Sequence, residues 1–325
     1  MKICVYGAGA IGGFLAARLA AAGAEVSVIA RGAHLEAIRA RGLRLHFEGR
    51  EEAVRVPATD DPAELGPQDY VLLTLKVTAL PAAATGIAPL LASETTIVSA
   101  QNGLPWWYFY KHGGPLDGRS LASLDPERRL WSALPPERCL GCVVYAAAEV
   151  PEPGLIDCPH AGHFPLGEPD GSRSPRLAAL AEILESAGLK APLREKIRDE
   201  IWLKLLGNLT FNPISVLTLG GMASLARDPG TRGVIRRMME EAWQVAETLG
   251  VSFPVDIETR IDWAGKLGDL KTSMLQDLEQ RRAMEIDALV AAVAEIGDLL
   301  DIETPAIDTV LGLVIHRARL AGCYP

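Results

Sequence analysis

The stretch KICVYGAGAIGGFLAARLAAAGAEVSVIAR, residues 2–31, decides the fold class of this chain. A short apolar run leads into a glycine-rich turn, a segment rich in alanine and leucine that ends near Gly23, and a second apolar run. This order predicts a strand, a helix and a parallel strand, the unit from which doubly wound sheets are built. We therefore expect an α/β fold that begins with a Rossmann-type domain.

The turn between the first strand and the helix has the pattern G-x-G-x-x-G. In this pattern the first glycine makes a tight turn, the second lets a pyrophosphate approach the backbone, and the third lets the helix pack closely on the strand. The helix N-terminus then faces the phosphates. The pattern predicts a dinucleotide site formed by Gly7, Ala8, Gly9, Ala10, Ile11 and Gly12.

The end of the second strand indicates which dinucleotide is bound. An NAD site usually has an acidic residue there, about 20 residues beyond the glycines, to bond the ribose 2′-hydroxyl. This chain has Ile29-Ala30-Arg31 at that place. An arginine suits a 2′-phosphate through its charged donors, so we expect NADP(H). The alternative for Arg31 is an exposed loop cation.

Two further segments, 69–77 and 95–103, are predicted as parallel strands, and they end near Lys76 and Asn102. Ligands in such sheets lie beyond the carboxyl ends of the strands, so both side chains are candidates for contact with cofactor or substrate. Either side chain could instead cap its loop. The later apolar segments between residues 139 and 168 have hairpin-like spacing, and we expect them to extend the same sheet.

Residues 104–137 form a long and unusual insertion with five consecutive aromatics at 106–110. One face of a single strand or helix cannot bury all five. One interpretation is that they pack the insertion onto its own domain or onto a second subunit. The other is that part of the segment closes over the substrate and changes which substrate fits.

The second half of the chain is predicted to be helical. Helical patterns cover residues 195–212, 231–249, 254–267, 279–300 and about 305–320, and Ser273 is expected to open a helix. We place the boundary near residue 190, which gives a domain of residues 1–190 and an all-α domain of residues 191–325. The long amphipathic helices permit a homodimer without requiring one.

One predicted helix contains the run KLLGNLTFNP, residues 204–213, in which Lys204, Asn208 and Asn212 are four residues apart. Four residues advance a helix by about 6 Å and turn it by roughly 40°, so the three side chains form one stripe. Polar groups within apolar chain need partners, either in the protein or on a ligand. The alternative is a solvated stripe on an amphipathic helix.

Composition excludes several classes of function. The chain has 325 residues and a formal net charge of -9, which argues against a general binder of nucleic acid or of anionic membranes. No uncharged apolar span of about 18 residues predicts a membrane helix, and the first residues, MKICVYGAGAIGG, lack the pattern of a signal peptide. We expect a cytoplasmic protein.

The cysteines form an odd set of five: Cys4, Cys139, Cys142, Cys158 and Cys323. The C-x-x-C pair at 139–142 opens a predicted strand, whereas redox pairs favour a helix N-terminus. No second pair or nearby histidine completes a zinc site. We expect all five thiols to be reduced, and no bound metal.

These motifs together resemble the ketopantoate reductase family, the NADPH-dependent 2-dehydropantoate 2-reductases. The resemblance rests on the glycine turn, Arg31, TLK ending at Lys76, QNG at 101–103, KLLGNLTFNP, TSMLQD at 272–277 and EID at 285–287, and it spans nearly the whole chain in the expected order. It implies a Rossmann domain followed by an all-α domain. It also implies a small 2-oxo acid as substrate and NADP(H) as cofactor, in a step that serves pantothenate synthesis.

The resemblance assigns roles residue by residue. Lys204 matches the catalytic acid, and Asn208, Asn212 and Ser273 match groups that bind substrate. Lys76 and Asn102 match groups around the nicotinamide half of the cofactor. Ala147 matches a backbone contact to the cofactor, and Glu285 matches an acid that contacts the bound cofactor. From the residues alone, Glu285 could orient Lys204, or could pair with Arg281 or Arg282 on a helix surface.

Two features depart from the family pattern. Downstream of Asn212, where members of the family have a further asparagine that faces the substrate, this chain has Met222. Residues 104–137 stand in place of the short helix that is common in the family. Alternatives therefore remain: a reductase of another 2-oxo acid or an imine, or a regulator that senses NADP without catalysis. A regulator has no need of the lysine and asparagine stripe.

Overall fold

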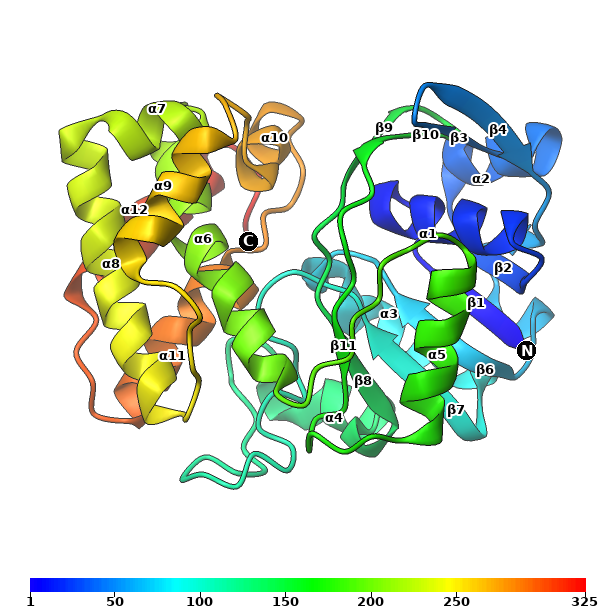
Figure 1. The fold of residues 1–325 in the computed structure, drawn as a ribbon, viewed down its shortest axis with the longest axis horizontal. Coiled ribbons are helices and arrows are strands. Elements are labelled where there is room, and N and C mark those ends of the chain that lie inside the picture. Colours follow the sequence, from blue (N-terminus) through cyan, green and yellow to red (C-terminus); the bar gives the residue numbers. More distant parts are fainter. The chain divides into compact units, whose positions relative to one another are not determined.

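The structure is a computed structural model that describes residues 1–325, and it divides into two compact units. Unit 1 comprises Met1–Gln101, Trp107–Gly118 and Arg128–Ile197, and unit 2 comprises Asn102–Trp106, Arg119–Glu127 and Arg198–Pro325. Figure 1 shows strands and helices in unit 1 and helices in unit 2. The predicted fold class, a Rossmann-type sheet with a C-terminal all-α part, is confirmed.

The main sheet of unit 1 has seven strands in the order β11-β8-β7-β6-β1-β2-β5. Their bounds are β1 (Lys2–Tyr6), β2 (Glu25–Ile29), β5 (Ala58–Thr59), β6 (Gln68–Leu73), β7 (Leu91–Ser99), β8 (Cys139–Cys142) and β11 (Leu166–Gly167). All neighbours pair in parallel except β11, which is antiparallel to β8. Numbered along the chain, the parallel strands run 3-2-1-4-5-6, the order of dinucleotide-binding sheets.

A second sheet of unit 1 has four strands in the order β4-β3-β10-β9. Their bounds are β3 (Leu43–Phe47), β4 (Arg50–Val54), β9 (Ala147–Glu152) and β10 (Leu155–His160). The expectation that all segments from 139 to 168 extend the main sheet is right for β8 and β11 but wrong for β9 and β10. Those two form a hairpin, and β10 pairs in parallel with β3 instead.

Helix α1 (Ala10–Ala21) contacts strands of both sheets. An ideal Cβ on Gly13 would lie 2.5 Å from the Ile156 side chain of β10, so the missing side chain lets the helix approach the second sheet. The ring of Phe14 meets that of Phe47 edge to face, with centroids 5.5 Å apart. This packing fixes the helix whose first turn contains the last residues of the glycine motif.

The remaining helices of unit 1 lie between or after these strands. They are α2 (Gly32–Arg41), α3 (Leu80–Ile87), α4 (Arg129–Ala133) and α5 (Pro175–Ser186), with short turns η1 (Pro62–Glu64), η2 (Val77–Ala79), η3 (Ala88–Leu90), η4 (Pro126–Arg128) and η5 (Pro136–Arg138). All five cysteines of the chain are free and buried, as the sequence predicts.

The aromatic run of the insertion is packed rather than open. Trp106, Trp107, Tyr108 and Phe109 are each at most 4% exposed. In unit 1 the indole of Trp107 donates to Ser99 Oγ at 2.9 Å, and its ring lies against Gly141, where a side chain would leave too little room. Of the two interpretations of this run, the structure supports packing.

The insertion is shared between the units, which differs from its expected place in the first domain alone. In unit 2 the backbone N–H groups of Ala122 and Ser123 donate to the Glu295 carboxylate at 2.6 and 2.8 Å. These bonds tie residues 119–127 to α11. The change from one unit to the other after the insertion falls between Ile197 and Arg198, a few residues beyond the expected boundary near 190.

Unit 2 consists of helices joined by short turns. Their bounds are α6 (Ile197–Thr218), α7 (Met222–Arg227), α8 (Pro229–Thr248), α9 (Ile257–Lys266), α10 (Ser273–Glu279), η6 (Asp287–Ala291), α11 (Ala292–Leu299) and α12 (Pro305–Leu320). The predicted helix 195–212 continues to Thr218 through Pro213. Proline removes one backbone hydrogen bond, but Ile214, Ser215 and Val216 are buried and hold the last turns in place.

The predicted helix 279–300 is two elements rather than one. Helix α10 ends at Glu279, and Arg281 has a φ of 52°, a left-handed conformation that interrupts the helix. The chain becomes helical again only after Glu285, through the π-helix η6. Glu285 therefore lies directly before a new helix, not inside a continuous helix over residues 279–300.

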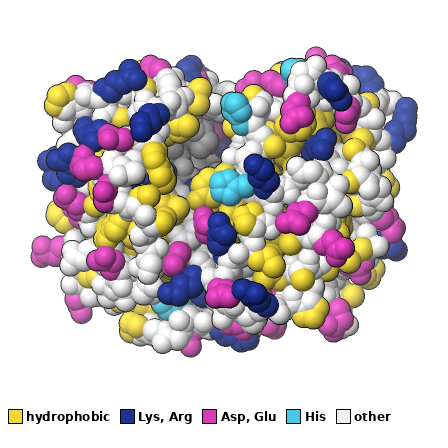
Figure 2. All heavy atoms as spheres, viewed as in Figure 1, with side chains coloured by type: hydrophobic (Ala, Val, Ile, Leu, Met, Phe, Trp, Pro, Cys, Tyr) yellow, Lys and Arg dark blue, Asp and Glu magenta, His cyan; other side chains and the backbone are white.

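One face of the molecule carries side chains of mixed character. Figure 2 shows hydrophobic side chains scattered among basic and acidic ones on the face that it presents. None of the helices combines the length and the apolar character that crossing a bilayer requires.

Candidate active site

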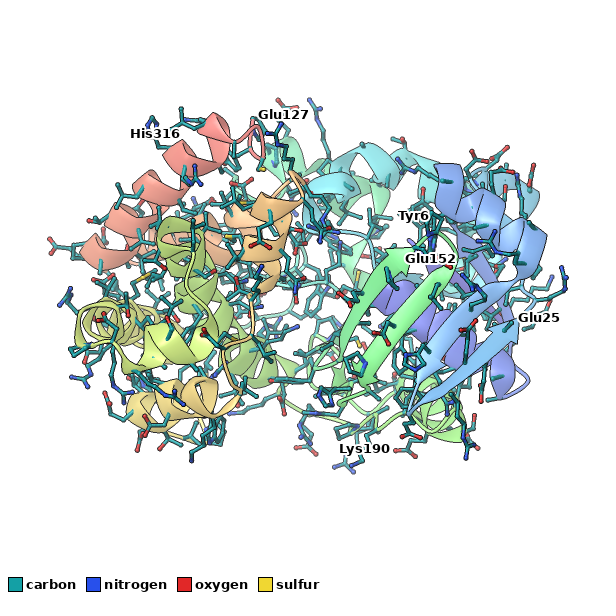
Figure 3. The ribbon with its side chains drawn as sticks, turned by 90° about the horizontal axis from the view of Figure 1, so that it is seen from above. Tyr6, Glu25, Glu127, Glu152, Lys190 and His316 are labelled. Carbon is teal, nitrogen blue, oxygen red and sulfur yellow. The ribbon has the colours of Figure 1, made fainter.

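The glycine turn of unit 1 lies between β1 and α1, directly after Tyr6, which Figure 3 labels. Gly7 has a φ of +108°, and an ideal Cβ on it would lie 2.9 Å from the backbone nitrogen of Leu75. An ideal Cβ on Gly12 would lie 2.1 Å from the Gly7 carbonyl oxygen. These two glycines are therefore required by the protein's own packing.

Gly9 differs from its two partners in the motif. An ideal Cβ on Gly9 would meet no atom within 4 Å, so the protein leaves open space there. Gly9 is also the N-cap of α1, and it has no side chain that could bond the N–H groups of the first turn. The N–H groups and the helix dipole at this end favour an anion, and the open space suits a pyrophosphate.

Two side chains that the sequence analysis did not single out hold this turn. Thr74 Oγ1 donates to the Gly7 carbonyl at 2.8 Å. His34 Nε2 lies 2.7 Å from the Ala8 carbonyl oxygen, and the Gly154 N–H donates to His34 Nδ1 at 3.0 Å. His34 is therefore neutral with its proton on Nε2, and burial lowers its pKa. Thr74 belongs to the TLK motif, whereas no local pattern marks His34.

The other predicted cofactor residues of unit 1 lie at strand and helix ends. Arg31 is exposed at the N-cap of α2, two residues after Ile29, whose carbonyl accepts from the N–H groups of Gly7 and Ala8. Lys76 precedes η2 beyond the end of β6. Ala147 is the exposed first residue of β9.

The polar stripe of unit 2 is real: Lys204, Asn208 and Asn212 all lie on α6. Lys204 and Asn208 are half-buried, and Asn212 is only 4% exposed. Between them, Gly207 makes room for Arg260, because an ideal Cβ there would lie 2.1 Å from Arg260 Nη2. Glycine costs about 1 kcal/mol inside a helix relative to alanine, and this close approach accounts for it.

Lys204 reaches a residue a hundred positions earlier in the chain. Its ammonium donates to Asn102 Oδ1 at 2.7 Å, and Asn102 Nδ2 lies 3.5 Å from Glu285 Oε2. Glu285 is 7% exposed. The amide of Asn102 thus stands between an ammonium and a buried carboxylate, and both favour the same orientation of the amide.

Arg282 was one alternative partner of Glu285 from the sequence. In the structure Arg282 donates from Nε to Asp277 Oδ1 at 3.0 Å. Glu285 lies with Asn102 and Lys204 in one group of contacts.

The residue after Asn102, Gly103, has to be a glycine. It has a φ of +81°, and an ideal Cβ on it would lie 2.4 Å from the Ala288 carbonyl oxygen of η6. That same carbonyl accepts from the Leu104 N–H at 3.0 Å. Backbone contact with η6 therefore fixes the segment that carries Asn102.

A second pair of predicted residues also meets in unit 2. Asn212 Nδ2 lies 3.5 Å from Ser273 Oγ, and Ser273 is exposed at the first position of α10. Thr272 caps α10, and its hydroxyl lies 2.6 Å from Ser215 Oγ of α6. This buried hydroxyl pair joins the two helices and brings Asn212 and Ser273 together.

The two units supply different chemistry. An open glycine turn at a helix N-terminus is built for a dinucleotide, which carries hydride. A half-buried ammonium held by an amide can stabilise and protonate an oxygen that becomes negative. A protein with both belongs to the class of nicotinamide-dependent oxidoreductases that reduce carbonyl groups.

Known proteins place the chain within that class. The family description "Ketopantoate reductase PanE/ApbA" matches residues 3–171, and its C-terminal counterpart matches residues 196–318. A 2-dehydropantoate 2-reductase of Mesorhizobium japonicum is 54% identical over 325 residues, which is 100% of each chain. One of Archaeoglobus fulgidus is 28% identical over 96% of each chain. The chain belongs to the ketopantoate reductase family and is an oxidoreductase that acts on CH–OH and carbonyl groups.

Solved structures agree. A candidate ketopantoate reductase from Ralstonia solanacearum MolK2 has a TM-score of 0.95 and 44% identity, with 99% of each chain covered. A D-mandelate dehydrogenase solved with NADH and anilino(oxo)acetate has a TM-score of 0.83 at 23% identity, over 99% of each chain, and at that identity it shows the shared fold alone. The family requires a nicotinamide cofactor and a small-molecule substrate.

Proposed function

We propose that the protein reduces 2-dehydropantoate to pantoate, with hydride from NADPH and a proton from Lys204, as a step of pantothenate biosynthesis in the cytoplasm. The observation that carries the mechanism is the 2.7 Å contact between Lys204 Nζ and Asn102 Oδ1. The contact holds the ammonium in one place, so that the substrate meets a fixed proton donor. The relatives named 2-dehydropantoate 2-reductase support the choice of substrate.

The chemistry follows from what hydride does to a ketone. As hydride adds to the carbonyl carbon, negative charge develops on the oxygen. An ammonium within hydrogen-bond reach stabilises that charge and then gives up its proton, so Lys204 serves both steps. Asn102 accepts from Lys204 in the protein and thereby keeps the ammonium oriented.

The substrate's remaining polar groups need partners of their own. We assign the amides of Asn208 and Asn212 and the hydroxyl of Ser273 to this role, with Ser273 as the donor to the carboxylate. The 3.5 Å approach of Asn212 to Ser273 supports a joint role for the two. Amide and hydroxyl donors fix a small acid by direction as well as by charge.

The cofactor would lie along the glycine turn, with its pyrophosphate at Gly9, and Arg31 would contact the 2′-phosphate. We assign Lys76, Asn102, Ala147 and Glu285 to contacts with the nicotinamide half and its ribose. The fold alone does not choose between the two nicotinamide cofactors, since a protein of the same fold was solved with NADH. The choice of NADPH rests on Arg31, exposed at the N-cap of α2 where an NAD site usually has an acid.

The cofactor assignment is tested with Arg31→Ala. Loss of a charged hydrogen bond is worth about 1.5 to 3 kcal/mol, so the Kd for NADPH should rise roughly 10-fold to 150-fold while that for NADH changes little. The matched control is Arg50→Ala, which removes another exposed arginine of unit 1. Equal affinity of the unmodified protein for NADH and NADPH would contradict the assignment.

The substrate is tested by turnover with NADPH and a panel of 2-oxo acids, which includes 2-dehydropantoate, pyruvate, a branched 2-oxo acid and an aryl 2-oxo acid. We expect the highest kcat/KM for 2-dehydropantoate. A higher value for another acid moves the assignment to that acid. No turnover with any of them, together with tight NADPH binding, favours a sensing role instead.

A further inference from the structure

Residues 323–325 of unit 2 are held firmly although they follow the last helix. Cys323 is 1% exposed, and its N–H donates to the Ala318 carbonyl at 2.8 Å. Arg319 Nε donates to the Pro325 carbonyl at 2.9 Å, and its guanidinium lies 5.6 Å from the centre of the Tyr324 ring. These contacts are on α12, whose exposed His316 Figure 3 labels. The segment is a fixed support.

This support makes two hydrogen bonds to the chain around Glu285. The Met284 N–H donates to the Cys323 carbonyl at 3.0 Å. The Tyr324 hydroxyl donates to Asp287 Oδ1 at 2.6 Å. Glu285 lies between these two anchored positions. Burial, and then the bond to Asp287, raises the pKa of Tyr324 to about 12, so the phenol keeps its proton and remains the donor.

The same short stretch also contacts the segment that carries Asn102. The Ala288 carbonyl of η6 accepts from the Leu104 N–H, and Gly103 lies directly against it. Asn102 then reaches Glu285 and Lys204. Residues 284–288 are therefore held by Cys323 and Tyr324, and they contact the residues that hold Lys204.

The geometry of η6 makes external anchors important. A π-helix has wider turns than an α-helix and occurs mostly as a short insertion, often at functional sites. Asp287 opens η6, and burial raises the pKa of its carboxyl. Without the Tyr324 hydroxyl, this carboxyl loses its hydrogen-bond donor. The first turn of η6 is then held from outside only by the Leu104 N–H, which donates to the Ala288 carbonyl.

We propose that Tyr324 is a positioning residue of the reaction: through Asp287 it fixes the start of η6, and so keeps Glu285 and Asn102 where they hold the Lys204 ammonium. This inference rests on the proposed role of Lys204. Tyr324 acts only through these neighbours and not on the reacting atoms. Its effect should fall mainly on kcat, because the proposed pyrophosphate site at the glycine turn belongs to unit 1. A smaller rise in the KM for NADPH is expected as well, because Glu285 and Asn102 are assigned to the nicotinamide half of the cofactor.

The first test compares Tyr324→Phe with Tyr70→Phe. Both remove one phenol hydroxyl that makes a short hydrogen bond, since the Tyr70 hydroxyl donates to the Arg176 carbonyl of unit 1 at 2.7 Å. We expect Tyr324→Phe to lower kcat about tenfold with a smaller rise in the KM for NADPH, and Tyr70→Phe to leave kcat unchanged. Equal losses of kcat in the two variants would overturn the inference, because they would reflect general destabilisation.

The second test works even where Tyr324→Phe folds poorly. Asp287→Ala removes the acceptor and should lower kcat about tenfold, whereas Asp287→Asn keeps an amide oxygen as acceptor and should recover most of that loss. A folded Asp287→Ala protein with unchanged kcat overturns the inference.

Lys204→Ala separates the proposed role of Lys204 from the positioning role of Tyr324. If it abolishes turnover while Tyr324→Phe and Asp287→Ala behave as the unmodified protein, the positioning role is wrong and the proposed function stands. If Lys204→Ala turns over normally, the assignment of Lys204 as proton donor fails, and the positioning role fails with it, whereas the reduction itself stands. In the Lys204→Ala background, Tyr324→Phe should cause no further loss, since its effect passes through Lys204.

Discussion

The glycine turn of unit 1 and the polar site of unit 2, the two parts of the proposed active site, are built in opposite ways. The turn works by what is missing: Gly7 and Gly12 let the protein pack on itself, and Gly9 leaves space for a ligand. The polar site works by what is present, an ammonium, an amide and a carboxylate in contact. The turn is six consecutive residues, whereas Asn102, Lys204 and Glu285 come from three distant parts of the chain.

This difference determines which substitutions matter and how. A side chain added to the turn acts through space, either on the fold or on the cofactor, depending on which glycine receives it. A side chain removed from the polar site acts through chemistry and leaves the fold largely intact. Substitutions that separate binding, folding and turnover are therefore the sharpest tests of the contrast.

The largest effect is expected for Lys204→Ala. The substitution removes the proton donor and the charge that stabilises the developing alkoxide, so kcat should fall on the order of 100-fold or more. The affinity for NADPH should remain, because the phosphate turn lies in unit 1. Steady-state kinetics and direct cofactor titration measure the two quantities separately.

Lys266→Ala is the matched control for this prediction. Lys266 is an exposed lysine in the last turn of α9, also in unit 2, and its loss should leave kcat within about twofold. A Lys204→Ala protein that turns over like this control would show that the stripe is structural and would remove the contrast between the two regions.

The sequence predicted the turn far better than the polar site. The G-x-G-x-x-G pattern joins a strand and a helix that are both local, so its fold follows from about thirty consecutive residues. The stripe on α6 was also predictable, because helical spacing places Lys204, Asn208 and Asn212 on one face. What the stripe contacts was not, since periodicity carries no information about distant segments.

The wrong predictions arise for the same reason: local patterns carry no information about contacts with distant segments. The sequence predicted a helix over residues 279–300, which includes Glu285, because the pattern does not reveal the left-handed conformation of Arg281. It assigned β9 and β10 to the main sheet, because hairpin spacing does not say which sheet a hairpin joins. His34 was missed for the same reason, since its two partners, Ala8 and Gly154, are far from it in the chain.

Within the turn, Gly9→Ala and Gly12→Ala should fail in different ways. The methyl group that Gly9→Ala adds would enter open space in the free protein, so stability should be retained while the KM for NADPH rises about tenfold. The methyl group that Gly12→Ala adds would lie 2.1 Å from the Gly7 carbonyl oxygen, so the free energy of unfolding should fall by about 1 to 3 kcal/mol. Thermal unfolding without cofactor and NADPH titration distinguish the two.

An equal loss of stability in both variants would mean that Gly9 is also required by packing. The turn would then no longer differ from the polar site in offering free space to its ligand. Gly23→Ala is a less suitable control, because its φ of +87° adds backbone strain, so the unmodified protein is the reference for both.

The smallest effect is expected from His34, which is the one place where the turn depends on a titrating side chain. The neutral ring donates from Nε2 to the Ala8 carbonyl and accepts the Gly154 N–H at Nδ1. Burial lowers the pKa of His34, so the neutral form is favoured in the folded protein. The bridge is therefore complete above the ordinary histidine pKa of about 6.5 and is lost as the pH falls through the lowered value, because a proton on Nδ1 would face the Gly154 N–H.

We therefore expect acidification to raise the KM for NADPH in both proteins. The rise should be about threefold larger in the unmodified protein than in His34→Gln. The glutamine amide can donate to Ala8 and accept from Gly154 at any pH, so it keeps the bridge without titrating. The comparison also removes the titration of the cofactor's own phosphate, whose second pKa is about 6 and which is common to both proteins. Parallel pH profiles for the two would show that the turn holds its shape without His34, and that backbone packing at Gly7 and Gly12 is sufficient.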